Sequence, residues 1–419
     1  MDAIVRGRCY TDGRPVQQCI GISDGKIAAV SGSLDGDIVY DFGSKLVIPG
    51  AVDIHVHMRE PGATQKEDFA SGSLAALHGG VTCLLDMPNT NPPTTTSKTL
   101  REKKELAASR SYADFGLFAG VQAGSDIEAL SREGAVGVKL YMAGTTGDLA
   151  ATSPESLKEE LAAVAKTGKV LAVHAEDESL RGRGSESSLA DHLKNRRNEC
   201  ETSAIRRLLE LSAEGLRVHI CHVSARESIP LIANARNVTS EVTPHHLLLD
   251  KDAMLGSFGK VNPPLRRRED RQALFAALKE TRFDAIASDH APHTTEEKEE
   301  DFDFAPSGMP GVETTLPLMI QLVRERHLTL EDVVRRTSRR PAEMFGLNKG
   351  RIAVGYDADL VIIDPATSRE IRADDLHYRC AWTPYEGRLG VFPKAVFLRG
   401  EIMIEDGSLI GERSGRDVV

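Results

Sequence analysis

The chain has 419 residues, of which 41% are hydrophobic and 27% are charged, and its formal net charge is −10 at pH 7. That length exceeds the size at which one core usually stops growing, so we expect one large domain and a smaller one. The negative charge disfavours non-specific nucleic-acid binding, and no apolar stretch approaches the roughly 20 residues that span a bilayer. The six cysteines lack paired spacing and the N-terminus lacks a hydrophobic signal core, so we expect a cytoplasmic protein with reduced thiols.

Residues 1–50 hold short alternating strands broken by glycine and aspartate, a pattern typical of a small antiparallel sheet. From residue 51 the pattern changes to a strand followed by an amphipathic helix. Strands are predicted at 52–57, 81–86, 115–121, 135–141, 169–174, 217–222, 238–243 and 284–289. Helices are predicted between most of them, at 66–78, 97–109, 154–167, 199–213 and 268–280 among others. Eight such units are the number that closes a TIM-like (β/α)8 barrel.

Both ends of the chain are predicted to build the smaller domain. After further helical stretches, the chain returns to apolar strands at 359–364 and 395–400, which can complete the N-terminal sheet. We therefore expect a composite β domain made of residues 1–50 and 346–419, beside a barrel made of residues 51–345.

The first barrel strand ends in a His-x-His pair, His55 and His57. Side chains alternate between the two faces of a strand, so both rings project from one side and can bind one ion. Three later strands end in similar chemistry, at His174, His222 and Asp289. A single histidine on a strand is more often a hydrogen-bonded core or surface residue. The pair spacing and the shared strand-end position, where barrel enzymes carry their active sites, favour a metal site.

Lys139 ends the fourth predicted strand and would face the same metal ions. An ammonium group a few Å from two divalent ions would cost several kcal/mol even at an effective dielectric constant of about 20. Conversion of the amine to a carbamate by CO₂ reverses the sign of the charge and lets one side chain bridge both ions. The alternative is a Lys139 ammonium group paired with a carboxylate of the barrel.

Several motifs resemble those of the dihydroorotases in the amidohydrolase superfamily. They are His55-Val56-His57-Met58-Arg59-Glu60-Pro61-Gly62, Asp86-Met87-Pro88-Asn89-Thr90, Gly137-Val138-Lys139-Leu140-Tyr141, Val173-His174-Ala175-Glu176, Cys221-His222-Val223-Ser224, Val261-Asn262-Pro263-Pro264-Leu265-Arg266 and Ser288-Asp289-His290-Ala291-Pro292-His293. The resemblance covers the whole barrel in the expected order. It implies a TIM-like barrel with a composite β domain, and the reversible hydrolysis of L-dihydroorotate to N-carbamoyl-L-aspartate in pyrimidine biosynthesis.

The resemblance also implies a binuclear zinc centre. The implied ligands are His55, His57 and Asp289 for the more buried zinc ion, and His174 and His222 for the more exposed one. Lys139, carboxylated on N6, and a hydroxide would bridge the two ions. Some branches of the family carry an aspartate in place of this lysine, so the lysine favours the carbamate form. Asp289 is the expected catalytic residue, which accepts a proton from the hydroxide and passes it to the leaving ring nitrogen.

Dihydroorotate carries a carboxylate beside a cyclic ureide, so its site needs a cationic fork and amide donors. The substrate-binding residues implied by the resemblance are His57, Arg59, Asn89, Asn262, His293, Ser307 and Gly308. Arg59 is suited to grip the carboxylate, and Gly308 suits a close approach of the backbone to a ligand. The alternatives are a surface salt bridge between Arg59 and Glu60 or Asp68, and an ordinary loop glycine at position 308.

Three further features receive structural interpretations. Cys221 is expected on the opposite strand face from His222, which argues against a nucleophilic cysteine. The charge run at 294–301 is typical of a solvated loop, which could still shape a lid. The segment 195–200 departs from a turn that many relatives carry there, and the chemistry is not expected to depend on it.

Two other function classes stay open. Allantoinases and hydantoinases share the metal constellation and differ chiefly in their substrate loops, but their substrates lack the carboxylate that Arg59, Asn89 and His293 suit. A non-catalytic scaffold relative would usually have lost metal ligands, whereas all six ligand positions hold competent residues here. The partners expected are a small-molecule substrate and further copies in a homo-oligomer. A complex with aspartate carbamoyltransferase, which some relatives form, stays open.

Overall fold

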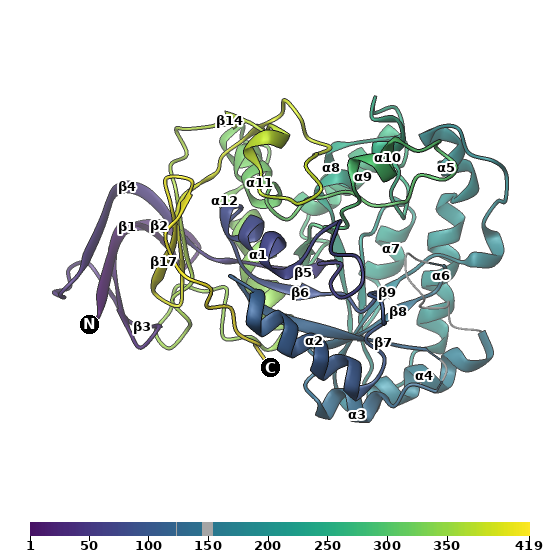
Figure 1. The fold of residues 1–419 in the computed structure, drawn as a ribbon, viewed down its shortest axis with the longest axis horizontal. Helices are drawn as coiled ribbons and strands as arrows, with labels where there is room; N and C mark the ends of the chain where they lie inside the picture. Colours follow the sequence, from purple (N-terminus) through teal and green to yellow (C-terminus); the bar gives the residue numbers. More distant parts are fainter. Residues whose placement is uncertain (123, 145–153) are drawn as a thin grey trace.

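The computed structural model describes residues 1–122, 124–144 and 154–419. Figure 1 shows two parts, a barrel of strands and helices on the right and a β sheet on the left. Purple N-terminal and yellow C-terminal strands lie together in that sheet, so both chain ends build it. The predicted fold class, a TIM-like barrel with a small composite β domain, is confirmed.

The barrel consists of eight parallel strands that pair with their neighbours in chain order. They are β5 (Ala51–Val56), β6 (Val81–Asp86), β7 (Asp114–Gly120), β8 (Gly137–Tyr141), β9 (Val170–His174), β10 (Arg217–Ile220), β11 (Val238–Val242) and β12 (Ala285–Ile286). The two outermost strands meet through a hydrogen bond of 2.8 Å from the amide of His57 to the carbonyl of His290. All eight predicted strands are present, and the barrel is nearly closed.

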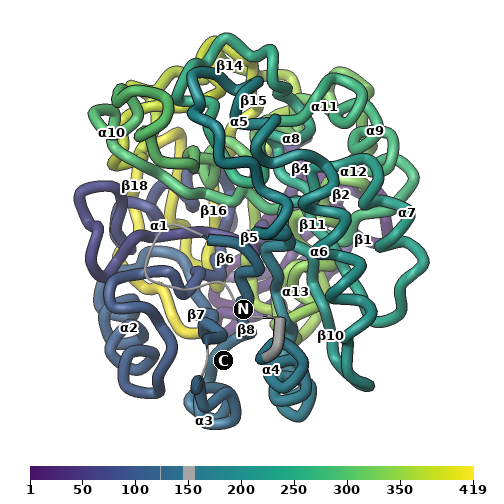
Figure 2. The backbone as a smooth tube through the Cα atoms, turned by 90° about the vertical axis from the view of Figure 1, so that its right-hand side faces the viewer, coloured from purple at the N-terminus to yellow at the C-terminus, as the bar shows by residue number. Residues whose placement is uncertain are grey.

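Helices surround the barrel, as Figure 2 shows in a view turned by 90°. Those between barrel strands are α1 (Phe69–His78), α2 (Ser97–Arg110), α3 (Ile127–Arg132), α4 (Pro154–Thr167), α5 (Leu189–Asn195), α6 (Asn198–Leu211), α7 (Ser228–Ala233), α8 (Pro244–Leu248) and α9 (Arg268–Lys279). Four more follow the last strand: α10 (Thr295–Glu299), α11 (Thr315–Arg324), α12 (Leu330–Val334) and α13 (Arg340–Phe345). The first helix begins three residues later than predicted, because the Asp68 side chain caps it by accepting the amide of Ser71.

The small sheet has the strand order β18-β17-β16-β13-β4-β1-β2-β3. Its strands are β1 (Ala3–Thr11), β2 (Arg14–Ser23), β3 (Lys26–Ser31), β4 (Val39–Pro49), β13 (Leu360–Ile363), β16 (Pro393–Leu398), β17 (Glu401–Glu405) and β18 (Ser408–Leu409), and β14 (Arg369–Glu370) pairs separately with β15 (Leu389–Gly390). The expectation of a purely antiparallel sheet was wrong, because β1 and β4 pair in parallel. β4 joins the two halves by pairing with β13 on its other side. The domain boundaries at residues 50 and 345 stay predictions.

A buried lysine joins the small sheet to the barrel. The Lys349 ammonium group lies 2.7 Å from a carboxylate oxygen of Asp114, at the start of β7, and 3.1 Å and 2.8 Å from those of Asp357 and Asp359. The carboxylate of Asp359 raises the pKa of Lys349, although burial alone would lower it. The ammonium group therefore stays charged and neutralises carboxylates contributed by both parts of the molecule.

We predict that Lys349→Met lowers the free energy of unfolding by about 3–5 kcal/mol, because it leaves the buried carboxylate of Asp359 without its cation and removes one of the two cations that pair with Asp114. Denaturant unfolding followed by circular dichroism would measure the change. Lys394→Met is the matched control, since Lys394 pairs with Asp406 on the surface, where an ion pair contributes at most about 1 kcal/mol. Equal losses in the two variants would contradict the joining role of Lys349.

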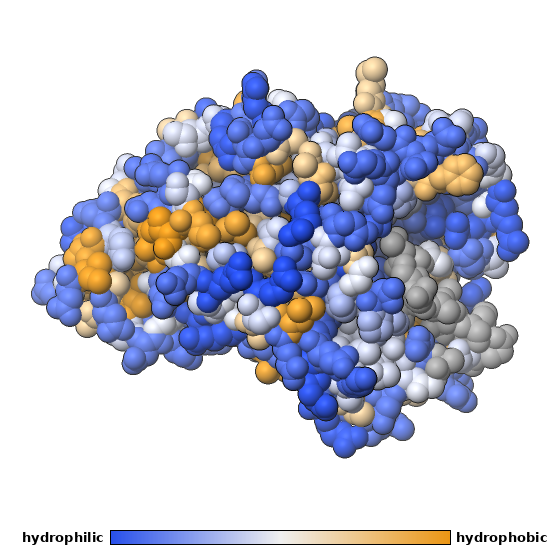
Figure 3. Space-filling model, viewed as in Figure 1, coloured by the Kyte–Doolittle hydropathy of each residue, from blue (hydrophilic) through white to orange (hydrophobic). Residues whose placement is uncertain are grey.

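The visible surface is mostly hydrophilic over the barrel, and apolar side chains gather over the small sheet on the left of Figure 3. This distribution fits a chain with a net charge of −10. Within the described ranges, none of the helices has the length and apolar character needed to cross a membrane.

Candidate metal centre and substrate cavity

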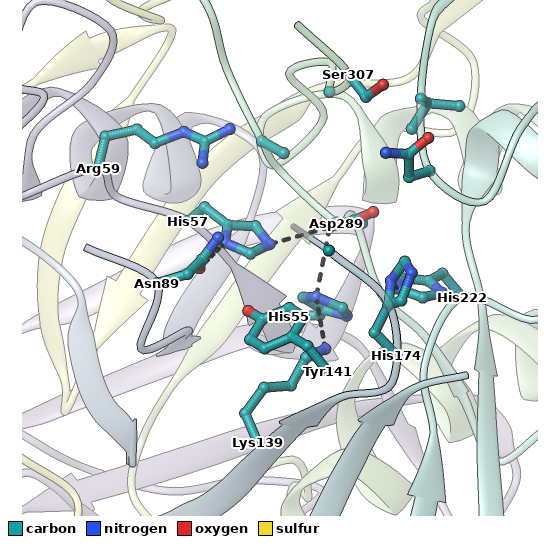
Figure 4. A pocket seen from close by; sticks show the side chains of 15 residues that line it. His55, His57, Arg59, Asn89, Lys139, Tyr141, His174, His222, Asp289 and Ser307 are labelled. Atoms are coloured by element: carbon teal, nitrogen blue, oxygen red, sulfur yellow. Dashed lines mark hydrogen bonds and ion pairs between the residues drawn. The ribbon is translucent and has the colours of Figure 1, made fainter. Parts of the chain in front are cut away.

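A cavity opens where the C-terminal ends of the barrel strands converge (Figure 4). Its empty volume is about 470 Å³, a figure that includes open solvent at the mouth. The predicted site residues that line it are His55, His57, Arg59, Asn89, Lys139, His174, His222, Asn262, Asp289, Ser307 and Gly308. One predicted residue, His293, is not among the lining residues that the structure describes.

His55, His57 and Asp289 form one group of possible metal ligands. One carboxylate oxygen of Asp289 lies 3.4 Å from Nε2 of His55 and 3.3 Å from Nε2 of His57. Ligands about 2.0–2.1 Å from a tetrahedral zinc ion lie roughly 3.3 Å from one another. The three ligand atoms therefore have the spacing that a zinc ion requires, and all three side chains are buried.

His174 and His222 form a second pair beside the first group. Nδ1 of His174 lies 3.1 Å from Nε2 of His222, which is also close to the separation of two ligands on one zinc ion. Burial lowers the pKa of His222 well below its ordinary value, and it does the same for His57. Neutral imidazole is the form of histidine that binds metal ions, so burial holds these rings ready to ligate.

Lys139 lies between the two histidine groups with its side chain completely buried. Its Nζ is 3.4 Å from Nε2 of His55 and 3.1 Å from Sγ of Cys221. No carboxylate of a described residue lies within 4.0 Å of this ammonium group, so the alternative of an ion pair is not observed. A buried amine that faces imidazole nitrogen fits a position made for a carbamate better than one made for a cation.

The position of Cys221 corrects the expectation from strand alternation. We expected Cys221 on the face opposite His222 and away from the site, but its Sγ contacts the amine of Lys139. The reason is local, because β10 ends at Ile220 and His222 has a φ of 36°, so alternation does not continue beyond the strand. Burial raises the pKa of the Cys221 thiol to about 12, which still argues against a nucleophile.

Glu241, on β11, orients ligands of both groups and was missed by the sequence analysis. Its carboxylate accepts hydrogen bonds from Nδ1 of His55 at 2.5 Å, from Nε2 of His219 at 3.0 Å and from the amide of His222 at 3.1 Å. Burial would raise the pKa of Glu241, but His55 and His219 hold it below its ordinary value. A glutamate next to the end of the barrel strand Val238–Val242 was the available signal.

The other ligand histidines are oriented in the same way. Nδ1 of His57 lies 2.7 Å from Oδ1 of Asn89, and Nε2 of His174 lies 2.9 Å from the carboxylate of Glu176. Arg196 pairs with that carboxylate, and both side chains are buried. The segment 195–200 was expected to lie outside the chemistry, but through Arg196 it supports a predicted metal ligand.

Arg59 is buried at the wall of the cavity. Its Nε donates to the carbonyl oxygen of Pro292 at 3.0 Å, and a terminal nitrogen lies 3.2 Å from Nε2 of His293. Glu60 and Asp68 pair with Arg110 instead, so the alternative of a surface salt bridge for Arg59 was wrong. Burial lowers the pKa of His293 to about 3, so its ring is neutral, and its Nε2 lies 3.2 Å from both a terminal nitrogen of Arg59 and the carbonyl oxygen of Ser307. The contact with His293 therefore helps to fix the position of the Arg59 guanidinium group.

Gly308 lines the cavity next to His293, and the approach of a ligand to its backbone stays a prediction. Its amide donates to the carbonyl oxygen of Lys260 at 2.9 Å, and its own carbonyl oxygen accepts from the ammonium group of Lys298 at 3.1 Å. A Cβ added at Gly308, whose φ is 146°, would lie 2.4 Å from the carbonyl oxygen of Ala291. Glycine is thus required by the packing of the protein itself.

The charge run at 294–301 is not a fully solvated loop. Residues Thr295–Glu299 form α10, and Lys298 on that helix is completely buried. The Lys298 ammonium group donates to the carbonyl oxygens of Pro306 at 2.8 Å and of Gly308 at 3.1 Å. Lys298 therefore holds the backbone on both sides of Ser307 in place.

Tyr141 also lines the cavity, and the sequence analysis gave it no role. It is the last residue of β8 and lies two positions beyond Lys139. Strand alternation places both side chains on one face, so the spacing was a usable signal.

The family model described as "Amidohydrolase family" matches residues 46–402 of the chain. A dihydroorotase of Methanosarcina acetivorans is 41% identical, with 96% of this chain and 91% of the relative covered. A dihydroorotase of Halobacterium salinarum is also 41% identical, with 99% of both chains covered. The chain belongs to the dihydroorotases of the amidohydrolase family.

The solved structures that resemble this chain are named for other substrates. The L-hydantoinase (dihydropyrimidinase) from Arthrobacter aurescens has a TM-score of 0.95 and 32% identity, with 100% of this chain and 99% of that chain covered. The dihydropyrimidinase from Brevibacillus agri has a TM-score of 0.92 and 27% identity, with 100% and 98% covered. The barrel and the small sheet are therefore shared beyond the dihydroorotases.

We predict that Glu241→Gln weakens metal binding about 10–100-fold, because the group that orients His55 and His222 loses its charge. Release of zinc from the loaded protein to a chromogenic chelator would measure the effect directly. Glu67→Gln is the matched control, since Glu67 is a buried glutamate outside the cavity that accepts a hydrogen bond from the hydroxyl of Ser71. Equal zinc release from the wild type and Glu241→Gln would contradict the orienting role.

Proposed function

We propose that this dihydroorotase interconverts L-dihydroorotate and N-carbamoyl-L-aspartate at a centre of two zinc ions. His55, His57 and Asp289 would hold one ion, His174 and His222 the other, and Lys139, carboxylated on N6, would bridge them. The observation that carries the proposal is the buried guanidinium group of Arg59 in the same cavity as these ligands. A cationic fork beside a hydrolytic metal centre suits a cyclic amide that bears a carboxylate.

Different residues of the cavity bind different groups of the substrate. Arg59 grips the substrate carboxylate, and its hydrogen bonds to Pro292 and His293 hold its fork in one orientation. Asn262, on the opposite side, has its side-chain oxygen fixed by Nε2 of His192 at 2.9 Å. The amide group of Asn262 can therefore donate to the ring carbonyl or ureide edge, together with Ser307 on the adjacent loop.

Asp289 is the catalytic base and then the catalytic acid. When bound, zinc ions supply the acidity that yields hydroxide from water near neutral pH and the charge that polarises the ring carbonyl. Asp289 accepts the proton at a carboxylate oxygen and returns it to the ring nitrogen that leaves.

The competing function is that of a hydantoinase, because the similar solved structures bear that name. Hydantoin has no carboxylate, so a buried arginine in its cavity would remain without a counter-ion after binding. A buried unpaired charge is strongly unfavourable, and this argument favours dihydroorotate.

The proposal is tested by turnover of L-dihydroorotate, allantoin and hydantoin on protein assayed for zinc per chain. We expect selective hydrolysis of dihydroorotate with about two zinc ions bound. Zinc-loaded protein that prefers hydantoin or allantoin would keep the metal centre and overturn the assigned substrate. Protein that binds no zinc and turns over none of the three rings would support a scaffold instead.

We predict that Arg59→Met lowers kcat/KM for dihydroorotate at least about 10–100-fold, because a charge-assisted hydrogen bond to the carboxylate is lost. Any slow turnover of hydantoin should not fall, since that ring makes no such contact. Arg110→Met is the matched control, because Arg110 binds Glu60 and Asp68 outside the cavity. Equal losses for both rings would contradict the assignment of Arg59 as the carboxylate reader.

The expected oligomeric state and the expected partner protein rest on the resemblance alone. A homo-oligomer and a complex with aspartate carbamoyltransferase both stay predictions. Light scattering of the purified chain, alone and mixed with that transferase, would measure the mass of each species.

A further inference from the structure

The ring of Tyr141 lies beside the predicted metal ligands. Lys139 and Tyr141 project from the same face of β8. The ring centroid of Tyr141 lies 5.1 Å from Nζ of Lys139 and 6.1 Å from the ring centroid of His174, and Figure 4 shows Tyr141 next to Lys139. A substrate bound at the metal centre would therefore lie within reach of this phenol.

The Tyr141 hydroxyl group has no hydrogen-bond partner among the residues that the structure describes. The side chain is only 3% exposed, so bulk solvent has little access to it. A buried hydroxyl without a partner destabilises the folded protein. Such a group is expected where a ligand supplies the missing contact, and this one lines the substrate cavity.

The other polar side chains of the cavity already have assigned contacts. Arg59 is held by Pro292 and His293 on one wall, and Asn262 is held by His192 on another. A neutral phenol near the metal ligands can act as a donor at pH 7. The carbonyl oxygen of the amide that is cleaved gains negative charge as water adds, so a donor beside the metal centre would add to the polarisation that zinc supplies when bound.

We propose that Tyr141 is a catalytic residue whose hydroxyl donates a hydrogen bond to the carbonyl oxygen of the scissile amide. The proposal rests on the proposed cyclic-amide hydrolysis. Water adds across the C–N bond, the carbon gains the oxygen, and the leaving nitrogen gains the proton that Asp289 carries. Tyr141 keeps its own proton throughout and contributes only the hydrogen bond, which strengthens as the oxygen becomes an oxyanion.

Tyr141→Phe tests the proposal because it removes one hydroxyl group and keeps the ring. We expect kcat to fall about 100-fold, the usual effect of losing one oxyanion donor, while KM changes less than about threefold. Zinc per chain should stay at the wild-type value. The melting temperature should stay the same or rise, because the variant removes a buried polar group that lacks a partner.

Tyr378→Phe is the matched control. Tyr378 is also buried, but its hydroxyl accepts the amide of Glu313 at 3.0 Å, away from the cavity. Removal of that hydroxyl leaves a buried amide without its partner, so the melting temperature should fall while kcat stays at the wild-type value. Tyr141→Phe should therefore lower turnover without loss of stability, whereas Tyr378→Phe should lower stability without loss of turnover.

Four outcomes for Tyr141→Phe would overturn the proposal: an unchanged kcat, a higher KM at constant kcat, a loss of zinc, or a fall in melting temperature like that of Tyr378→Phe. A loss of zinc would mean that the hydroxyl serves the metal centre. All rates are measured on whichever ring the wild type prefers. A wild type that prefers hydantoin would thus overturn the assigned substrate and still leave the comparison of Tyr141→Phe decisive.

Discussion

Burial of ionisable groups at the open end of the barrel is the constraint on which the rest of the site depends. Removal of a carboxylate or imidazolium from water is so unfavourable that each group needs a partner or must become neutral. Glu241 satisfies this requirement for His55, and the pair of Glu176 and Arg196 does so for His174. These partners fix the direction in which each ring presents its remaining nitrogen, so burial itself preorganises the metal site.

The same constraint explains how much of the site could be predicted from the sequence. Strand alternation and strand-end position were sufficient for His55, His57 and Lys139, because those residues lie in or immediately beyond regular strands. Eight strand and helix units predicted the barrel for the same reason. Glu241 could not be assigned from its neighbours, since its function depends on His55, which lies 186 positions away in the chain.

Local pattern was misleading wherever long-range contacts determine burial. The charge run that contains Lys298 has the composition of a solvated loop, yet Lys298 is buried because loop carbonyls from 306 and 308 fold over its ammonium group. Arg196 lies in a polar segment, but its side chain is buried because it pairs with the buried carboxylate of Glu176. Composition reports the average preference of a segment for water, whereas a single side chain can be buried once its hydrogen bonds are met.

The comparisons separate the shared parts of the enzyme from its specific parts. The chain is 41% identical to a dihydroorotase and 32% identical to an L-hydantoinase, both over nearly the whole chain, and it shares the scaffold of the hydantoinase at a TM-score of 0.95. A barrel with its metal ligands can serve different cyclic amides, because the bond that breaks is the same. Discrimination would then come from groups that contact the rest of the ring, which is the role proposed for Arg59.

Backbone conformation at the strand ends supports this division. Arg59, His222 and Asp289 have φ values of 58°, 36° and 47°, in the left-handed region that residues other than glycine adopt rarely. Each lies just beyond its barrel strand, where continued alternation would direct its side chain elsewhere. The left-handed turn re-aims the side chain toward the cavity at a cost of about 1–3 kcal/mol per residue. Three of the eleven residues other than glycine that have a positive φ in the described part of the chain are thus a proposed substrate reader and two proposed metal ligands. At these three positions the backbone departs from regular strand geometry, so strand alternation alone did not predict the direction of the side chains.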